Sequence, residues 1–329
     1  MFLVGGEALF DLFVEPQTSF LPSRVGLNAV AGGSPFNVAV GLSRLGIKAG
    51  LLTGLSTDYL GKQLRQVLQE EGVSTRYLVE VNAPTTLSMV TVNEQGSPHY
   101  SFYGEAGADR QLAPHHLPEL EAEVRGVHVG SYSLVVQPTA DALYQLVADA
   151  SKERLITLDP NVRLNVEPDV GLWRKQIAAF AQHAHIIKVS EEDLELLYPN
   201  EAPAVVARNW LSNQCQWVLL THGEKGVSVF TRNRGDWLHP GRPLTPVDTV
   251  GAGDTFQAAV IAFLTEQGLD HPASVATLEQ ERIEAMLAFA CEAAALTCTR
   301  RGPDLPRRHE LPVITANSWN HSTSLSQAV

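Results

Sequence analysis

The chain has 329 residues, of which 44% are hydrophobic and 18% are charged, and this composition is typical of a globular protein with a sizeable core. Lys and Arg total 24 against 36 Asp and Glu, so the formal net charge is −12. This charge argues against nucleic acid or an anionic membrane as the main partner, because both bind basic surfaces. The three cysteines form no C-x-x-C pair, and the N-terminus lacks the pattern of a signal peptide. We therefore expect a cytoplasmic protein with reduced thiols.

Two glycines and a well-delimited helix follow the N-terminal strand. Gly32 and Gly33 precede residues 34–46, in which Ser34 suits the N-cap and Gly46 suits the end of a helix. Paired glycines allow the backbone to approach a ligand closely. Asn37, one turn into the helix, offers both a hydrogen-bond donor and an acceptor.

A second region predicts a small sheet that stands apart from the main one. Residues 85–92 and 99–103 are β-prone and flank the turn 93–96, which is the pattern of a hairpin. This hairpin interrupts the alternation of strands and helices elsewhere. Together with residues 9–30 it is expected to form the separate small sheet.

The second half of the chain alternates short apolar runs with helical stretches. The predicted strands are 127–129, 155–158, 185–189 and 217–220, and the predicted helices include 140–152, 172–183 and 204–212. Such alternation indicates an α/β fold with a parallel sheet covered by helices on both faces. Polar residues follow three of the strands, and ligands bind at the carboxyl ends of strands in such sheets.

The run from Gly251 to Asp254 is the strongest candidate for chemistry. Gly251, Ala252 and Gly253 precede an apolar helix that ends near Gly268, and Asp254 lies in its first turn. Backbone N–H groups and the helix dipole at this point form a site for an anion such as a phosphate. A carboxylate beside it could act as a general base, although a lone Asp here would more often be a helix cap.

The longer string of residues 248–256, Asp-Thr-Val-Gly-Ala-Gly-Asp-Thr-Phe, resembles the C-terminal signature of the ribokinase family of carbohydrate kinases, the PfkB type. Residues 32–46 and 54–61 look like the N-terminal signatures of the same family. The resemblance implies a Rossmann-like three-layer α/β/α ribokinase-like fold with a small β-sheet lid. It also implies one kinase domain over residues 1–311, with the lid formed mainly by about 9–30 and 84–104. The remaining residues, 312–329, are rich in Ser and Asn and are expected to form a frayed tail.

The resemblance also implies roles for individual residues. Asp254 would be the general base, beside an anion hole made by Gly251, Ala252 and Gly253. The residues implied to bind the sugar or lie near it are Asp11, Gly32, Gly33, Asn37, Asn161 and Arg163, the last two from an element that resembles the D-P-N-x-R of fructokinase-like members.

ATP and Mg²⁺ follow from the same resemblance. The residues implied to bind the nucleotide are Lys188, Ser190, Thr221, Gly223 and Gly226. Either Glu192 or Asp193 would hold Mg²⁺, through water, and Asp248 with Val250 would bind an activating K⁺. No G-x-x-x-x-G-K-[ST] loop occurs, which argues against a P-loop kinase.

The sequence motifs say less about the identity of the acceptor sugar than about the other ligands. Residues 102–109 are similar to a stretch of bacterial fructokinases, which favours D-fructose phosphorylated at O6. A 2-keto-3-deoxygluconate kinase and a riboside kinase remain alternatives, as does a sensor that binds sugar or nucleotide without catalysis. A homodimer formed through the lid is a further expectation.

Overall fold

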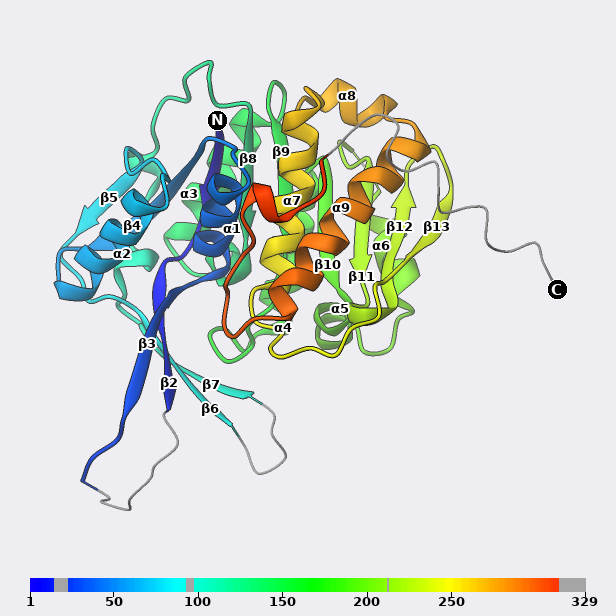
Figure 1. Ribbon diagram of the computed structural model, residues 1–329. Helices are drawn as coiled ribbons and strands as arrows, with labels where there is room; N and C mark the ends of the chain where they lie inside the picture. Colours follow the sequence, from blue (N-terminus) through cyan, green and yellow to red (C-terminus); the bar gives the residue numbers. More distant parts are fainter. Residues whose placement is uncertain (15–22, 93–97, 212, 314–329) are drawn as a thin grey trace.

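A computed structural model describes residues 1–14, 23–92, 98–211 and 213–313 of the chain (Figure 1). The predicted turn at 93–96 and residues 314–329 of the predicted tail lie outside the described residues. The described part contains one large sheet between two layers of helices and a smaller sheet beside them. No helix in these ranges is both long and apolar enough to cross a membrane.

The large sheet has nine strands in the order β13-β12-β11-β10-β9-β8-β1-β4-β5. The strands are β1 Phe2–Gly5, β4 Ala49–Ser56, β5 Leu78–Val81, β8 Gly126–Gly130, β9 Leu155–Asp159, β10 Ile186–Ser190, β11 Trp217–Thr221, β12 Gly226–Thr231 and β13 Asp236–Pro240. All neighbours from β11 to β5 pair in parallel, whereas β12 and β13 are antiparallel additions at one edge. The central strands are apolar and buried on both faces, as expected for a parallel sheet between helices.

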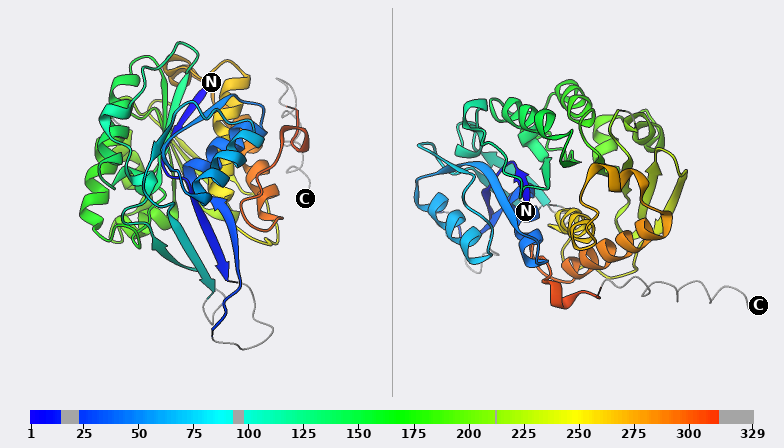
Figure 2. Two further views of the ribbon diagram at one scale, coloured as in Figure 1. Left: turned by 90° about the vertical axis from the view of Figure 1, so that its left-hand side faces the viewer. Right: turned by 90° about the horizontal axis from the view of Figure 1, so that it is seen from above.

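Helices cover both faces of this sheet (Figure 2). One face carries α1 Ser34–Arg44, α2 Tyr59–Glu70, α7 Ala252–Glu266 and α9 Gln280–Cys298. The other face carries α3 Thr139–Ala150, α4 Val170–Ala181, α5 Glu191–Leu197 and α6 Pro203–Trp210. The remaining helices are short: α8 Pro272–Thr277 and the 3₁₀ turns Ala108–Arg110, Pro114–His116, Ser131–Leu134, Gly223–Lys225 and Arg308–Glu310. Each face has its own hydrophobic core, which gives the three layers.

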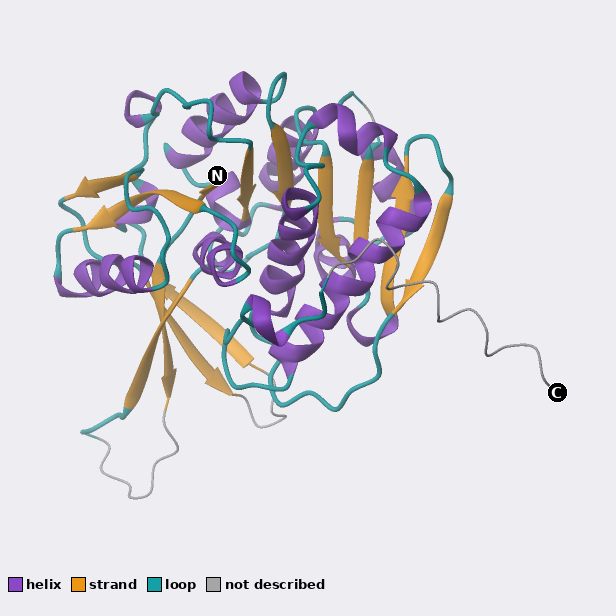
Figure 3. Ribbon diagram, turned by 45° about the horizontal axis from the view of Figure 1, so that its top comes forward, coloured by secondary structure: helices purple, strands orange, loops and turns teal. Residues whose placement is uncertain are grey.

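The smaller sheet projects from the body of the molecule (Figure 3). Its strands are β2 Leu9–Val14, β3 Leu27–Gly32, β6 Leu87–Val92 and β7 Pro98–Tyr103, in the order β3-β2-β6-β7. β2 and β6 pair in parallel and the other two pairs are antiparallel. The predicted hairpin is therefore present as β6 and β7, and its partners come from the predicted N-terminal segment.

Two carboxylates, the exposed Asp58 and the buried Asp109, anchor the small sheet where β6 begins. Asp58 accepts hydrogen bonds from the backbone N–H of Thr85, at 2.8 Å, and from its hydroxyl, at 2.7 Å. Asp109 accepts from the hydroxyls of Thr86 and Tyr132. The path of the chain into β6 is consequently fixed by side chains of the main body.

The predicted α/β/α fold with a small extra sheet is confirmed. The four predicted strands are all present, and each begins and ends within one residue of its prediction. One local prediction was wrong: Gly33, not Ser34, is the N-cap of α1, and Ser34 is the first helical residue. The physical reason is that the Ser34 hydroxyl is engaged by a distant partner, as described below.

Candidate active site

The N-terminus of α7 lies at the carboxyl edge of the large sheet, and it begins with a tight glycine turn. Gly251 is the N-cap with φ 79°, in the left-handed region where a side chain would be strained. A Cβ atom built on it would also lie 2.8 Å from the side chain of Pro303. The turn leaves the first backbone N–H groups of a 15-residue helix at the edge of the site, where the helix dipole favours an anion.

Asp254 is buried in the first turn of α7, with both of its oxygens held by α1. The hydroxyl of Ser34 donates to Oδ1 at 2.6 Å, and the amide of Asn37 donates to Oδ2 at 2.8 Å. Burial raises the pKa of Asp254, and these two hydrogen bonds oppose the rise. The carboxylate is therefore fixed in position, and its two partners favour its ionised form.

Asp11 lies in the middle of β2, beside the glycine pair. A Cβ atom on Gly32 would lie 2.5 Å from Asp11 Oδ2, so the absence of a side chain at Gly32 makes room for the carboxylate in its present position. Burial raises the pKa of Asp11 to about 6, while Arg163 lowers it and Asp254 raises it. Asp11, Arg163 and Asp254 thus act on one another electrostatically, although they come from three distant parts of the chain.

Gly33 has φ 104°, and a Cβ atom on it would lie 2.8 Å from the backbone carbonyl of Glu7. Glu7 is fully buried and accepts a hydrogen bond of 2.6 Å from the Ser133 hydroxyl. Burial raises the pKa of Glu7 to about 7. No local sequence pattern marks Glu7, because its burial depends on β8 and the turn after it, more than 100 residues away.

Lys188 is buried on β10 and reaches the start of α7. Its ammonium donates to Asp159 Oδ2 at 2.8 Å. A Cβ atom on Gly253 would lie 2.9 Å from the same ammonium, so the absence of a side chain at this position makes room for it. A permanent cation therefore lies against the N-terminus of α7.

The acidic turn after β10 holds the loop after β9. Asp193 accepts the backbone N–H of Val162 at 2.7 Å with Oδ1, and the Ser190 hydroxyl at 2.6 Å with Oδ2. Ser190 and Asp193 also form the capping box of α5. Both side chains are thus used to fix the loop that carries Asn161, which has φ 40°, and Arg163. Glu192, the other predicted metal residue, is exposed.

A pocket of about 220 Å³ lies beside the start of α7. The predicted nucleotide residues Thr221, Gly223 and Gly226 line it together with Ala252 and Gly253. On its other side lie small residues of α9, Cys291, Ala294, Ala295 and Cys298. The structure therefore brings the predicted nucleotide loop and the predicted anion hole to one pocket.

Asp248 is engaged in fixing the backbone. Its Oδ1 accepts the N–H of Val250 at 3.0 Å and its Oδ2 accepts the N–H of Gly302 at 2.9 Å. These bonds join the segment before α7 to the segment after α9. The stretch of Asp248 and Val250, which was expected to bind K⁺, thus lies against the segment that follows α9.

Within the described ranges, no group of three or more His, Cys, Asp or Glu side chains is placed to hold a metal ion. A Mg²⁺ ion that keeps several waters and binds phosphate oxygens fits this arrangement better than one held by a protein cage.

Comparison with known proteins places the chain in a family. Residues 11–309 match the pfkB family of carbohydrate kinases. The chain is 32% identical over 329 residues to a fructokinase of Rhizobium leguminosarum bv. trifolii, covering 97% of this chain and 94% of that protein. It is 32% identical over 313 residues to fructokinase-2 of Solanum lycopersicum, covering 93% of each. A crystal structure of fructokinase with bound ATP from Xylella fastidiosa superposes with a TM-score of 0.85 at 26% identity, over 94% of this chain and 96% of that one.

The chain therefore belongs to the pfkB family of carbohydrate kinases, as its motifs indicated. It is an ATP-dependent sugar kinase of this family.

Proposed function

We propose that the protein transfers the γ-phosphate of ATP to O6 of D-fructose and that Asp254 is the general base. The observation that carries this proposal is the arrangement at the start of α7. A buried carboxylate with two fixed oxygens lies beside a helix N-terminus and a buried ammonium. A base next to a site for developing negative charge is what phosphoryl transfer requires.

In the proposed step, the sugar hydroxyl oxygen attacks the γ-phosphorus in line with the leaving oxygen. The new bond is between this oxygen and the γ-phosphorus, and the bond between the γ-phosphorus and the β–γ bridging oxygen breaks. The hydroxyl proton passes to Asp254, and the bond electrons leave with ADP. The N–H groups of Gly251 and Gly253 and the Lys188 ammonium would stabilise the charge on the phosphoryl oxygens. The N–H of Ala252, which was also expected to take part, instead donates to the carbonyl of Thr249 at 3.2 Å.

The sugar is proposed to lie between the small sheet and α1. Asp11 on β2 and Arg163 after β9 would bind its hydroxyls, and Gly33 would allow the backbone to approach it. Asn37 would orient Asp254 as well as contact the sugar, since its amide already donates to the carboxylate. The small sheet would act as a lid that excludes water from the phosphoryl group.

Mg²⁺ would reach the site with the phosphates of ATP, whose negative charge it neutralises. Glu192 is the proposed acceptor for its waters, because both oxygens of Asp193 are occupied by the α5 cap and Val162. Asp193 would instead keep the loop of Asn161 and Arg163 in place.

The choice of fructose rests on two observations. The compared relatives are named fructokinases. Phe102 belongs to the stretch that resembles bacterial fructokinases. Its ring packs edge-on against the ring of Tyr132, with 5.9 Å between the ring centroids, where the small sheet meets the main body. Residues that select the sugar would be held there.

The test is ADP release with Mg²⁺·ATP and a panel of acceptors: fructose, 2-keto-3-deoxygluconate, ribose and adenosine. The expected result is turnover with fructose at the highest kcat/KM. Turnover with another acceptor and not with fructose would contradict fructose as the substrate but would still support a kinase reaction. Ligand-induced stabilisation without ADP release on any acceptor would favour a sensor and contradict the proposed reaction.

A further inference from the structure

The ion pair between Lys188 and Asp159 is built into the large sheet. β9 and β10 are parallel neighbours, and Leu158 pairs with Ile187 one residue before the two charged positions. This register brings both side chains to the carboxyl edge of the sheet. The side chains are only 6% and 0% exposed, and their atoms Nζ and Oδ2 are 2.8 Å apart.

Within the described ranges, the Asp159 side chain makes few interactions apart from its ion pair with Lys188. Its second oxygen, Oδ1, is buried and lacks a hydrogen-bond partner within the described ranges. A buried carboxylate that caps no helix and holds no loop contributes little to the fold, and a buried ion pair adds little stability over apolar residues of the same volume. Its side chain makes one described hydrogen bond, and that bond is to Lys188.

Lys188, in turn, is directed to the start of α7 by this contact. Its ammonium is 2.9 Å from the position that a Cβ atom of Gly253 would take. The charged or titratable groups that act on it are Asp159 from β9, Asp193 from α5, Asp254 from α7 and His128 from β8. Without Asp159, the ammonium would be drawn towards the other two carboxylates, and one of these is the proposed base.

We propose that Asp159 is a positioning residue for phosphoryl transfer, which holds the Lys188 ammonium against the start of α7 and away from Asp254. The inference rests on the proposed kinase function and deepens it. It assigns Asp159 an effect on the chemical step that passes through Lys188 and does not involve contact with the sugar.

The experiment is a double-mutant cycle of Asp159→Asn and Lys188→Gln, with steady-state kinetics on fructose and ATP. Lys188→Gln is expected to lower kcat by about 10²–10³-fold, as expected for the loss of one group that stabilises the transition state. Asp159→Asn is expected to lower kcat by about 10–10²-fold. In the Lys188→Gln background, Asp159→Asn should lower kcat by less than about a further 2-fold, because the side chain that Asp159 positions is no longer present. The KM for fructose should change by less than about 2-fold in all variants.

A matched control is Asp270→Asn. Asp270 is also a buried Asp in an ion pair, with Arg125 at 3.3 Å, but Arg125 precedes β8 and so lies at the opposite edge of the sheet. This control should keep kcat near that of the wild type. If Asp159→Asn alone fails to fold, Asp159→Glu takes its place in the cycle, because it keeps the negative charge but moves it; it should lower kcat in the wild-type background and have less than about 2-fold effect in the Lys188→Gln background.

Two results would overturn the inference. One is a wild-type kcat in folded Asp159→Asn. The other is an equal loss from Asp159→Asn in the wild-type and Lys188→Gln backgrounds, which would show that Asp159 acts independently of Lys188. Both require a wild-type enzyme that turns over, whereas a wild-type protein without ADP release contradicts the proposed function itself.

Discussion

Ser34 and Asn37 fix Asp254 from a helix that is more than 200 residues distant in sequence. Both partners donate hydrogen bonds, so both favour the ionised carboxylate against the effect of burial. A general base must be ionised before it accepts a proton. In the proposed reaction, the pKa of Asp254 would therefore set the acid limb of the pH profile.

Ser34→Ala is predicted to move that acid limb to higher pH. Loss of the hydroxyl removes one hydrogen bond to the ionised form, which raises the pKa of Asp254, so that activity falls most at low pH. The measurement is kcat/KM for fructose against pH. Ser43→Ala is a suitable control, because Ser43 is on the same helix but donates to the carbonyl of Glu71. If the acid limb of the kcat/KM profile moved to lower pH or stayed unchanged, the role of Asp254 as the general base would be contradicted.

Some of these residues could be predicted from the sequence and some could not. Asp254 and Gly253 belong to one short string, in which a glycine turn and a helix start are recognisable locally. The contact of Ser34 with Asp254 joins two helices, and a local interpretation assigned Ser34 to a helix cap instead. Either Glu192 or Asp193 was predicted to hold Mg²⁺ through water, and the contact of Asp193 with the backbone after β9 is revealed only by the packing of β9 on β10.

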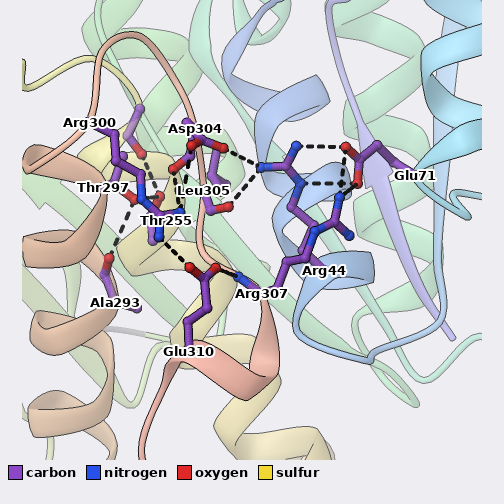
Figure 4. Close-up of polar contacts among 11 residues, drawn as sticks. Arg44, Glu71, Thr255, Ala293, Thr297, Arg300, Asp304, Leu305, Arg307 and Glu310 are labelled. Atoms are coloured by element: carbon purple, nitrogen blue, oxygen red, sulfur yellow. Dashed lines mark hydrogen bonds and ion pairs between the residues drawn. The ribbon is translucent and has the colours of Figure 1, made fainter.

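At the scale of elements, α1, α2 and the segment after α9 are joined by Arg44 (Figure 4). Arg44 makes a bidentate pair with Glu71, at 2.6 and 3.0 Å, and donates to the carbonyl of Leu305 at 2.7 Å. The same Glu71 also pairs with Arg307 at 3.3 Å. The C-terminal segment is thus fastened over α1, whose N-terminus holds Asp254.

Arg44→Ala is predicted to lower the free energy of unfolding by about 1.5–3 kcal/mol, the range for hydrogen bonds to charged groups. The control is Arg65→Ala, which breaks the exposed pair of Arg65 with Glu80 and should cost about 0–1 kcal/mol. Chemical denaturation of both variants makes the comparison. Equal losses would show that the Arg44 contacts add no more than a surface ion pair.

Elements were more predictable than their pairing. The alternation of apolar runs and helical stretches located β8 to β11, because a strand buried on both faces reads as a short apolar run. The antiparallel strands β12 and β13 were not predicted, because no α-helix separates β11, β12 and β13 and the alternation of strands and helices therefore stops at β11. The parallel pairing of β2 with β6 links residues 77 positions apart, such as Phe10 and Leu87, and local sequence carries no signal for it.

The whole molecule places the two proposed binding regions along one edge of the large sheet. Asp11 and Arg163 lie near Asp254, and the pocket beside Thr221 and Gly253 lies on the other side of the start of α7. The proposed donor and acceptor would therefore meet at this helix N-terminus. The general arrangement follows from the fold, because ligands of open α/β sheets bind at the carboxyl ends of the strands.

Ala294→Leu is predicted to weaken nucleotide binding without affecting sugar binding. Ala294 lines the pocket from α9, and a larger side chain would occupy part of it. The KM for ATP should rise by about 10-fold, equivalent to about 1.4 kcal/mol, while the KM for fructose stays unchanged. Ala288→Leu, on the same helix and similarly half-buried, is the control. A rise confined to the KM for fructose would place the nucleotide elsewhere.

The most direct test of the proposed mechanism is Asp254→Asn, which removes the carboxylate but keeps the shape of the side chain. Fructose and ATP binding should remain within a few-fold of the wild type by calorimetry. ADP release should fall by about 10²–10⁴-fold, the usual contribution of a general base. Near-wild-type turnover by this variant would contradict the role of Asp254 and with it the proposed reaction mechanism.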